Sequence, residues 1–446
     1  ISHYIFTHAE LGLQEYQSAT FLERYMEQQG FSVEKGVCGL ETAFLARWGS
    51  RGPCIALLAE YDALAGYGPE NKDPGHACGH NWIAATTAGA AVTLARYCAA
   101  EGLEAQILLV GSPAEETFSS KALLANAGVF DEVDCAMQAH LGAFHTVYPW
   151  SLALGTRQLI YTGKAAHASS QPWEGINALD AVRLFFNGVD AMRQQLKPDV
   201  RVHGIIQEGG QAANSIPERA SCLFYARTGR KDELQAVLER LENVARGAAL
   251  MTGTSYDRVF IDGTAELLPN YTLEKLMHSC FEEVGVPECT AEELEYAAAL
   301  KATYPPERDV PGIGAKFDAG IAKQVKALSE NMTKPVYDFL MPQYSGEGFR
   351  PGSTDVGDVS WQTPTAQIEV AAWPAGVPGH SWQVVACGKS SMAHKAMLCA
   401  GKVIASAAIE LLEQPALLEK AKSEFKERSA SGYVCPIEPD AVPIAL

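Results

Sequence analysis

Strand-like apolar runs alternate with helix-like segments through the first third of the sequence, and this alternation limits the possible folds more than any other feature. Apolar runs cover residues 54–64, 105–112 and 134–140. An Ala-rich segment at 81–100 and a shorter segment near 119–128 lie between them and are typical of helices. The alternation predicts an α/β fold with a largely parallel sheet covered by helices on both faces. Ligands bind at the carboxyl ends of the strands in such sheets.

The middle of the sequence follows a different order. Strand-like runs at 157–168, 201–209, 219–229 and 255–262 enclose two helix-like segments. The apolar stripes expected on these two helices are Leu179, Val182, Phe186, Val189 and Met192 or Arg193, and Leu234, Val237, Leu238, Leu241, Ala245 and Ala248. The order strand, helix, strand, strand, helix, strand predicts a ferredoxin-like α+β unit.

The α/β character returns near residue 267 and ends in a long helix near 390–413. We therefore expect one catalytic domain formed by residues 1–152 and 267–446, with the ferredoxin-like domain inserted at 153–266. A chain of 446 residues exceeds the size at which one hydrophobic core usually stops growing. Insertion into a surface loop is physically easy when the two ends of the insert lie close together.

Composition and charge exclude several classes of partner. A formal net charge of -18 repels phosphate backbones and anionic lipids, so we expect neither nucleic-acid nor membrane binding. The most apolar stretch, 83–100, contains three Thr and an Arg and is too short to span a bilayer. Eleven cysteines without a C-x-x-C pair indicate no disulfide framework, which favours a reducing cytoplasm. We interpret the start at Ile1, which lacks an initiator Met, as trimmed.

Side chains of metal-ligand type follow three of the expected strands. The segment "GHACGH" carries Cys78 and His80, "GSPAEE" carries Glu115 and Glu116, and His140 ends the third strand-like run. If these strands are neighbours, the side chains meet at one edge of the sheet. Thiolate and imidazole ligands favour zinc. The sequence therefore predicts a metal site at this edge.

The set is large enough for two metals when a further histidine comes from the C-terminal half of the chain. Two adjacent carboxylates then have different roles: Glu116 ligates, while Glu115 stays unbound and acts as general base. Other interpretations stay open at this point. Cys78 is also typical of a small buried side chain, the two glutamates of a solvated helix start, and His140 of a strand-end histidine.

Seven segments occur in the order found in a known family. They are "HAELGLQE" (8–15), "AEYDAL" (59–64), "GHACGHN" (75–81), "GSPAEE" (111–116), "GKAAHASSQPWEGINALDA" (163–181), "GGQAANSIPERA" (209–220) and "GSTDVGDVSW" (352–361). Together they resemble the dinuclear-metal aminoacylase and carboxypeptidase family, and its amidohydrolase branch in particular. The segments "ARGAALMTGT" (245–254) and 352–361 point to the p-aminobenzoyl-glutamate hydrolase subgroup. The resemblance covers nearly the whole chain.

The resemblance implies a catalytic domain with two divalent metals, zinc or manganese. The metal ligands implied for this branch are Cys78, His80, Glu116, His140 and His380. Glu115 is the implied base, and Asp62 matches an aspartate that orients a ligand histidine. The other late histidine, His394, is expected to pack or cap the final helix.

The inserted domain is implied to dimerise and to act as a lid. His167 matches a residue that reaches the active site of the partner subunit, and Asn214 and Arg227 match positions that contact the substrate carbonyl and carboxylate. Turn, strand-end and surface roles are the alternatives for these three residues. The chain departs from relatives at Asn81, Leu141 and Glu60, which leaves the metal set intact and affects the substrate assignment.

The expected function is hydrolysis of the amide bond in an N-acyl or N-aroyl amino acid such as p-aminobenzoyl-glutamate. A metal-bridging water attacks with Glu115 as general base. The expected assembly is a homodimer through the inserted domain, or a complex with a second homologous subunit. The alternatives are a dipeptidase, an N-acyl-amino-acid deacylase and a metal-binding paralogue without catalysis. Cysteine-nucleophile hydrolysis by Cys78 is disfavoured by the two histidines and two glutamates that accompany it.

Overall fold

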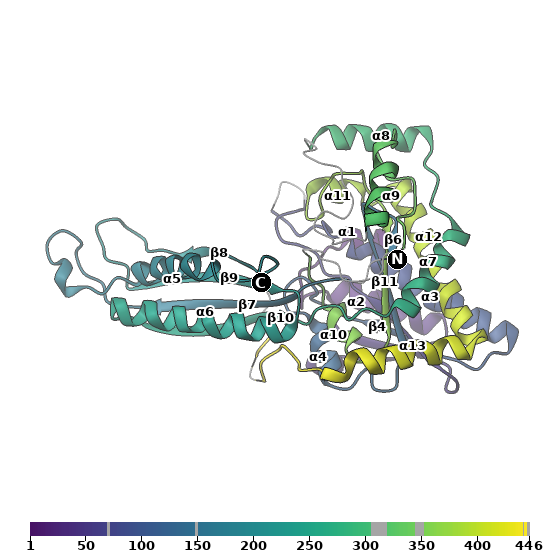
Figure 1. Cartoon of the computed structure of the whole chain (residues 1–446), viewed down its shortest axis with the longest axis horizontal. Helices are drawn as coiled ribbons and strands as arrows, with labels where there is room; N and C mark the ends of the chain where they lie inside the picture. The colour runs from purple at the N-terminus through teal and green to yellow at the C-terminus, as the bar shows by residue number, and fades with distance from the viewer. Residues whose placement is uncertain (69–71, 148–149, 305–318, 344–351, 440, 444–446) are drawn as a thin grey trace.

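The protein forms two bodies of different shape (Figure 1). The computed structural model describes residues 1–446 except 69–71, 148–149, 305–318, 344–351, 440 and 444–446. A larger α/β body contains a seven-stranded sheet, and a narrow body that projects from it contains a four-stranded sheet. This confirms the expected fold class, an α/β unit combined with a ferredoxin-like unit.

The seven-stranded sheet has a parallel centre and antiparallel edges. In sheet order its strands are β1 (Ser32–Lys35), β2 (Phe44–Trp48), β4 (Gln106–Gly111), β3 (Cys54–Ala59), β5 (Cys135–Gly142), β11 (Thr365–Ala371) and β6 (Thr146–Val147). The four strands β4, β3, β5 and β11 are parallel to one another. The pairings of β1, β2 and β6 are antiparallel, so the sheet as a whole is mixed.

Helices cover both faces of this sheet. α3 (His80–Glu101), α7 (Tyr271–Val284) and α12 (Ser391–Glu413) pack on the face that includes Ile55 and Leu57. α4 (Ser120–Asn126) and α10 (Val356–Ser360) pack on the opposite face, which includes Ala56 and Leu58. Every residue of β3 is buried, because the strand lies between two helical layers. The remaining α-helices of the described part of this larger body are α1 (Ser2–Thr7), α2 (Tyr16–Gln28), α8 (Ala291–Ala302), α9 (Ala319–Glu330), α11 (Trp382–Cys387) and α13 (Pro415–Arg428).

The projecting body has the ferredoxin-like order of elements. They are β7 (Ala153–Thr162), α5 (Ala178–Arg193), β8 (Arg201–Glu208), β9 (Arg219–Thr228), α6 (Lys231–Thr252) and β10 (Ser255–Thr264). The strands pair antiparallel in the order β10, β7, β9, β8. Both helices pack on one face of the sheet around a separate hydrophobic core. The domain limits 153 and 266 stay a prediction.

The buried stripe of α5 is rotated slightly from the predicted one. Phe185 is fully buried, whereas Leu179 and Phe186 are only partly buried. The stripe turns because α5 packs against both the sheet and α6, which a single period along the sequence does not reveal.

The C-terminal tail connects the two bodies. After α13 the chain returns to the projecting body, where the Glu438 carboxylate accepts hydrogen bonds from Arg258 at 2.6 and 3.0 Å. Glu438 also lies 3.1 Å from Arg157 Nη2. None of the helices in the described ranges combines the length and apolar composition needed to cross a membrane. Each of the eleven cysteines is a free thiol.

Candidate metal centre

The candidate ligands lie at the carboxyl ends of the parallel strands. Cys78 and His80 follow β3 through a loop, and His80 is the first residue of α3. Gly79 between them has a φ of +79°, and a Cβ there would lie 2.3 Å from the Trp82 ring. Glycine is therefore required at this turn, which directs Cys78 and His80 into the same site.

Two groups of three ligand atoms share the Cys78 sulfur. One consists of Cys78, His80 and His140, and the other of Cys78, Glu116 and His380, with the atoms of each group within 4.8 Å of one another. The Cys78 Sγ lies 3.5 Å from His140 Nε2. His380 Nε2 lies 3.2 Å from Glu116 Oε1. The structure thus brings together all five side chains expected as ligands from the sequence. Two further groups of ligand-type atoms overlap with them: His80 with Glu115 and Glu116, and Glu60 with Glu115 and Asp355.

The chemistry of these donors fits divalent metals. Asp62 Oδ1 lies 2.8 Å from His80 Nδ1, which directs Nε2 of this fully buried ring toward the centre. This Nε2 has no hydrogen-bond partner among the described residues. This buried ring nitrogen faces a thiol, a second imidazole and a carboxylate. Together these groups form the donor set expected of a metal site.

Electrostatics also favour cations at this centre. Burial opposes ionisation of Cys78, but His140 and His80 hold the pKa of its thiol well below the usual value. Hydrogen bonds with Cys78 and Glu116 raise the pKa of His380 to about 11. Without metals, protons on the histidines therefore balance the thiolate and carboxylates, and metal binding displaces such protons.

Glu115 lies beside these two groups but belongs to neither of the groups that contain Cys78. Its carboxylate is 3.9 Å from His80 Nε2. Burial raises the pKa of Glu115 well above its usual value, and three nearby carboxylates raise it further. These are the carboxylates of Glu60, Glu116 and Asp355. A carboxyl group with a raised pKa, next to a metal centre, is suited to general acid–base chemistry.

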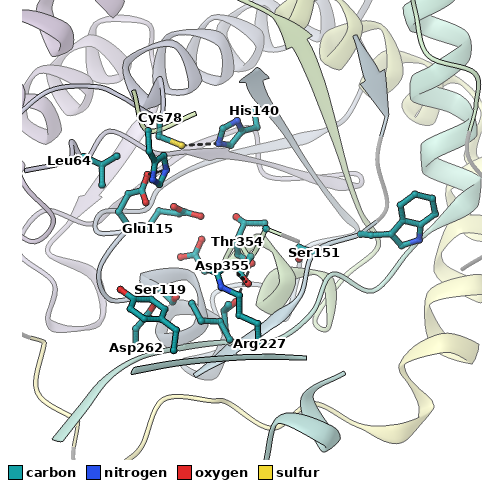
Figure 2. Close-up of a pocket in the computed structure, with 18 of the residues that line it drawn as sticks. Leu64, Cys78, Glu115, Ser119, His140, Ser151, Arg227, Asp262, Thr354 and Asp355 are labelled. Carbon is teal, nitrogen blue, oxygen red and sulfur yellow. Dashed lines mark hydrogen bonds and ion pairs between the residues drawn. The ribbon is translucent and has the colours of Figure 1, made fainter. Parts of the chain in front are cut away.

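A cavity of about 520 Å³ lies between the metal centre and the projecting body. Figure 2 shows Cys78, His140 and Glu115 on one side of it, with Arg227 and Asp262 on the other. Arg227 Nη1 donates a hydrogen bond to Ser353 Oγ at 3.0 Å. The structure therefore brings Arg227 to the same cavity as the metal centre.

Comparison with known proteins identifies this arrangement. Across 100% of this chain and 95% of the relative, the chain is 34% identical to a subunit of the p-aminobenzoyl-glutamate hydrolase of Escherichia coli (strain K12). It is 31% identical to Xaa-Arg dipeptidase of Mus musculus, across 96% of this chain and 88% of the relative. Residues 154–250 match the M20 peptidase dimerisation domain. The chain belongs to the M20 peptidase family. It is therefore a hydrolase of amide bonds.

Solved structures share the fold of this M20 chain. An aminobenzoyl-glutamate utilization protein from Klebsiella pneumoniae aligns with a TM-score of 0.58 and 19% identity, over 89% of this chain and 94% of that chain. A Bacillus subtilis protein described as a dinuclear metal binding peptidase from the M20 family aligns with a TM-score of 0.56 and 19% identity, over 92% and 96% of the two chains. The M20 fold therefore extends over both bodies of this chain.

Two predicted site residues of this M20 chain lie far from the cavity. Leu154, near the start of β7, lines the cavity. β7 ends at Thr162, and the eight residues of extended strand from Leu154 to Thr162 span about 26 Å. His167 and Asn214 are exposed beyond that far end, where Ala168 N–H donates to the Asn214 carbonyl at 3.0 Å. The structure therefore does not bring His167 and Asn214 to the metal centre of their own chain.

Several residues around the M20 site were not predicted from the sequence. Tyr225 and His203 line the cavity from the projecting body, and their rings stack with centroids 5.4 Å apart. Lys121 is fully buried and lies between Glu60 and Asp355. The one signal in the sequence was a lysine within the apolar helical run 120–126. A lysine in a helix is more often exposed to solvent than buried.

Proposed function

We propose that this M20 hydrolase uses two divalent metals, zinc or manganese, to cleave the amide bond of an N-acyl or N-aroyl amino acid. The proposed substrate is p-aminobenzoyl-glutamate or a close analogue. The observation that carries the proposal is the pair of ligand groups that share Cys78, with Glu115 beside them. The 34% identity to a p-aminobenzoyl-glutamate hydrolase subunit over the whole chain supports the substrate class.

The metals would be held by Cys78, His80 and His140 and by Cys78, Glu116 and His380. When bound, they supply Lewis acidity for the substrate carbonyl and lower the pKa of nearby water. In our proposal, Glu115 accepts a proton from the attacking water and delivers it to the nitrogen of the leaving amine. Asp62 keeps the His80 ring in the orientation that presents its Nε2 to the centre.

Substrate binding is assigned to residues of the projecting body. Arg227, which lines the cavity, would pair with the substrate carboxylate, because a guanidinium matches a carboxylate in charge and geometry. His167 and Asn214 lie too far from their own cavity, so we assign them to the cavity of a partner subunit. There they would donate hydrogen bonds to the oxygen that gains charge in the transition state. This assignment requires a dimer formed through the dimerisation domain, with a second copy or with a homologous second subunit.

Dipeptidase activity toward basic residues is the second candidate. Asp262 is buried in the cavity wall and could pair with a cationic substrate side chain. Burial raises the pKa of Asp262 to about 6, and the group is still ionised at pH 8. The relative that is 31% identical carries the name Xaa-Arg dipeptidase. A panel of p-aminobenzoyl-glutamate, N-acyl amino acids and dipeptides with C-terminal Arg or Glu separates these candidates.

Replacement of Glu115 by Gln tests the proposed mechanism. The variant keeps the ligand set, so we expect unchanged metal content. Loss of the general base should lower kcat by about 10²- to 10⁴-fold. Metal analysis and steady-state kinetics on the same metal-loaded preparation measure both quantities.

Glu34→Gln is the matched control, since Glu34 is exposed on the edge strand β1 and should keep full activity. A metal-loaded Glu115→Gln variant with the activity of the wild type would contradict the role of Glu115. Bound metal without hydrolysis of any amide in the panel by the wild type would instead favour a binding protein.

A further inference from the structure

Lys121 is the only described lysine whose side chain is fully buried, and it bridges two halves of the chain. Its Nζ donates to Glu60 Oε1 at 2.6 Å and to Asp355 Oδ1 at 2.6 Å, and all three side chains are fully buried. The Lys121 backbone N–H also donates to Asp355 Oδ2 at 3.0 Å. Asp355 is therefore held at both oxygens by one residue.

The other carboxylate of this bridge lies next to the metal centre. Glu60 follows β3 directly, and its Oε1 also accepts a hydrogen bond from Gln138 Nε2 at 2.6 Å. Its Oε2 lies 3.6 Å from Nε2 of the ligand His80. Gln138 in turn accepts a hydrogen bond from Gln367 at 2.9 Å. Glu60 is thus fixed across strands β3, β5 and β11.

Asp355 belongs to a loop at the hinge between the two bodies. We call residues 352–355 the hinge loop. The chain enters the projecting body at Leu152, whose N–H donates to the Gly352 carbonyl at 2.8 Å. It returns at Thr264, whose hydroxyl donates to the Thr354 carbonyl at 3.1 Å. The hinge loop therefore contacts both crossing points.

The hinge loop also holds the arginine of the cavity. Ser353 Oγ accepts the hydrogen bond from Arg227 Nη1 at 3.0 Å, two residues before Asp355. Hydrogen bonds connect Lys121 to Glu60 and to Asp355, the backbone connects Asp355 to Ser353, and a hydrogen bond connects Ser353 to Arg227. Displacement of Asp355 would move the hydrogen-bond acceptor that positions the guanidinium.

We propose that Lys121 is a positioning residue that fixes the hinge loop, and through it Arg227, relative to the metal centre. The part that concerns substrate rests on the proposed function, because it uses Arg227 as the carboxylate-binding residue. The part that concerns the hinge loop does not depend on any substrate. Two separate measurements therefore test the proposal.

Amide hydrogen exchange on the metal-loaded protein tests the hinge. In Lys121→Met the Leu152 amide should exchange about tenfold faster or more, because its acceptor is no longer held, while amides of β3 and β4 keep their protection. Lys422→Met is the matched control. Lys422 Nζ lies 2.6 Å from Asp134 Oδ1, and this ion pair is remote from the cavity. If Lys121→Met fails to fold, the charge-balanced double variant Lys121→Met with Asp355→Asn replaces it. Unchanged exchange at Leu152, or faster exchange throughout the sheet, would overturn the proposal.

Kinetics with a carboxylate substrate and its carboxamide test the effect on Arg227. For the carboxylate, Lys121→Met should raise KM about tenfold, because a small displacement of a clamping group weakens binding. For the carboxamide, KM should stay unchanged. The variant that combines Lys121→Met with Arg227→Met should be no worse than Arg227→Met alone.

Additive losses, or equal losses on both substrates, would show a purely structural lysine and contradict the proposed link to Arg227. A wild type that cleaves neither substrate contradicts the proposed function instead. The exchange measurement then still decides whether Lys121 fixes the hinge loop.

Discussion

At the scale of single residues, the site depends on backbone conformations that non-glycine residues seldom adopt. Ala114 has a φ of +56° just before the glutamate pair, and His380 has a φ of +55°. The Ala114 N–H donates to the buried Glu15 carboxylate at 2.8 Å, and the His380 N–H donates to the Ala77 carbonyl at 2.9 Å. These bonds stabilise two strained turns, as is common where side chains must be aimed at a functional centre.

The shared position of Cys78 leads to a prediction about metal content. Cys78→Ala removes a ligand from both groups, so we expect weaker binding of both metals. The loss should exceed the roughly 10- to 100-fold that follows loss of a supporting hydrogen bond to a ligand. Metal titration of the apoprotein measures it. His394→Ala is the control, because His394 lies outside the ligand groups. Retention of two tightly bound metals by Cys78→Ala would rule out the shared ligand.

At the scale of elements, helix α7 is closed at its N-terminus by side chains from two segments. Asn270 Oδ1 accepts a hydrogen bond from Leu273 N–H at 3.1 Å. Glu424 of α13 accepts from the N–H groups of Tyr271 and Thr272 at 2.9 and 3.0 Å. The free N–H groups of the first turn are thus paired, and α13 is fixed against α7. The same turn buries Glu274, whose Oε1 accepts from Asn270 N–H at 3.1 Å.

Glu274 predicts a pH dependence of stability. Burial raises the pKa of Glu274 from 4.5 to about 8, so the folded protein binds its proton more tightly than the unfolded chain does. This contribution to stability is fully present below pH 4.5 and is lost as the pH rises through about 8. Glu274→Gln stays neutral and should lack this decline, which amounts to on the order of a few kcal/mol. Denaturant unfolding between pH 5 and 9 measures it, and parallel curves for both proteins would contradict the prediction.

At the scale of the whole molecule, the cavity wall comes from two bodies that contact each other at several places. Among the described residues these include the chain crossings beside the hinge loop, the hydrogen bond from Arg227 to Ser353, and Glu438 of the C-terminal tail, which binds Arg157 and Arg258. The projecting body carries Arg227 at the end near the cavity and His167 at the far end. The two ends of the projecting body therefore face different surroundings: one end faces the cavity of its own chain, and the other lies far from it.

Mixed dimers test whether His167 works across subunits. His167→Ala and Glu115→Gln should each be inactive as homodimers. When the two variants assemble at random into symmetric dimers, half of the dimers are mixed, and each mixed dimer has one intact site. About a quarter of all sites should therefore be active. Activity after co-expression and joint purification measures this. Failure of the mixture to regain activity would indicate a site completed within one chain or by another subunit.

Much of the fold follows from local patterns in the sequence. The apolar runs at 54–64 and 134–140 predicted β3 and β5, and the order of elements in the middle predicted the ferredoxin-like unit. These predictions were possible because strand and helix periods are set by neighbouring residues. The ligand types at strand ends likewise predicted a cluster, because parallel strands end at one edge of a sheet.

Contacts between distant segments could not be derived in this way. The sequence did not indicate that Lys121 pairs with Asp355, 234 positions away, or that Cys78 is common to two ligand groups. It also did not show which end of the inserted unit faces the cavity. Each of these depends on how whole elements pack, which is decided by the summed burial of many side chains and by the pairing of buried charges. Local periodicity therefore sufficed to predict the helices and strands and the edge of the sheet where the ligands gather. Only the packing of distant segments determined that Cys78 is common to two ligand groups, that Lys121 is buried, and how the hinge loop joins the two bodies.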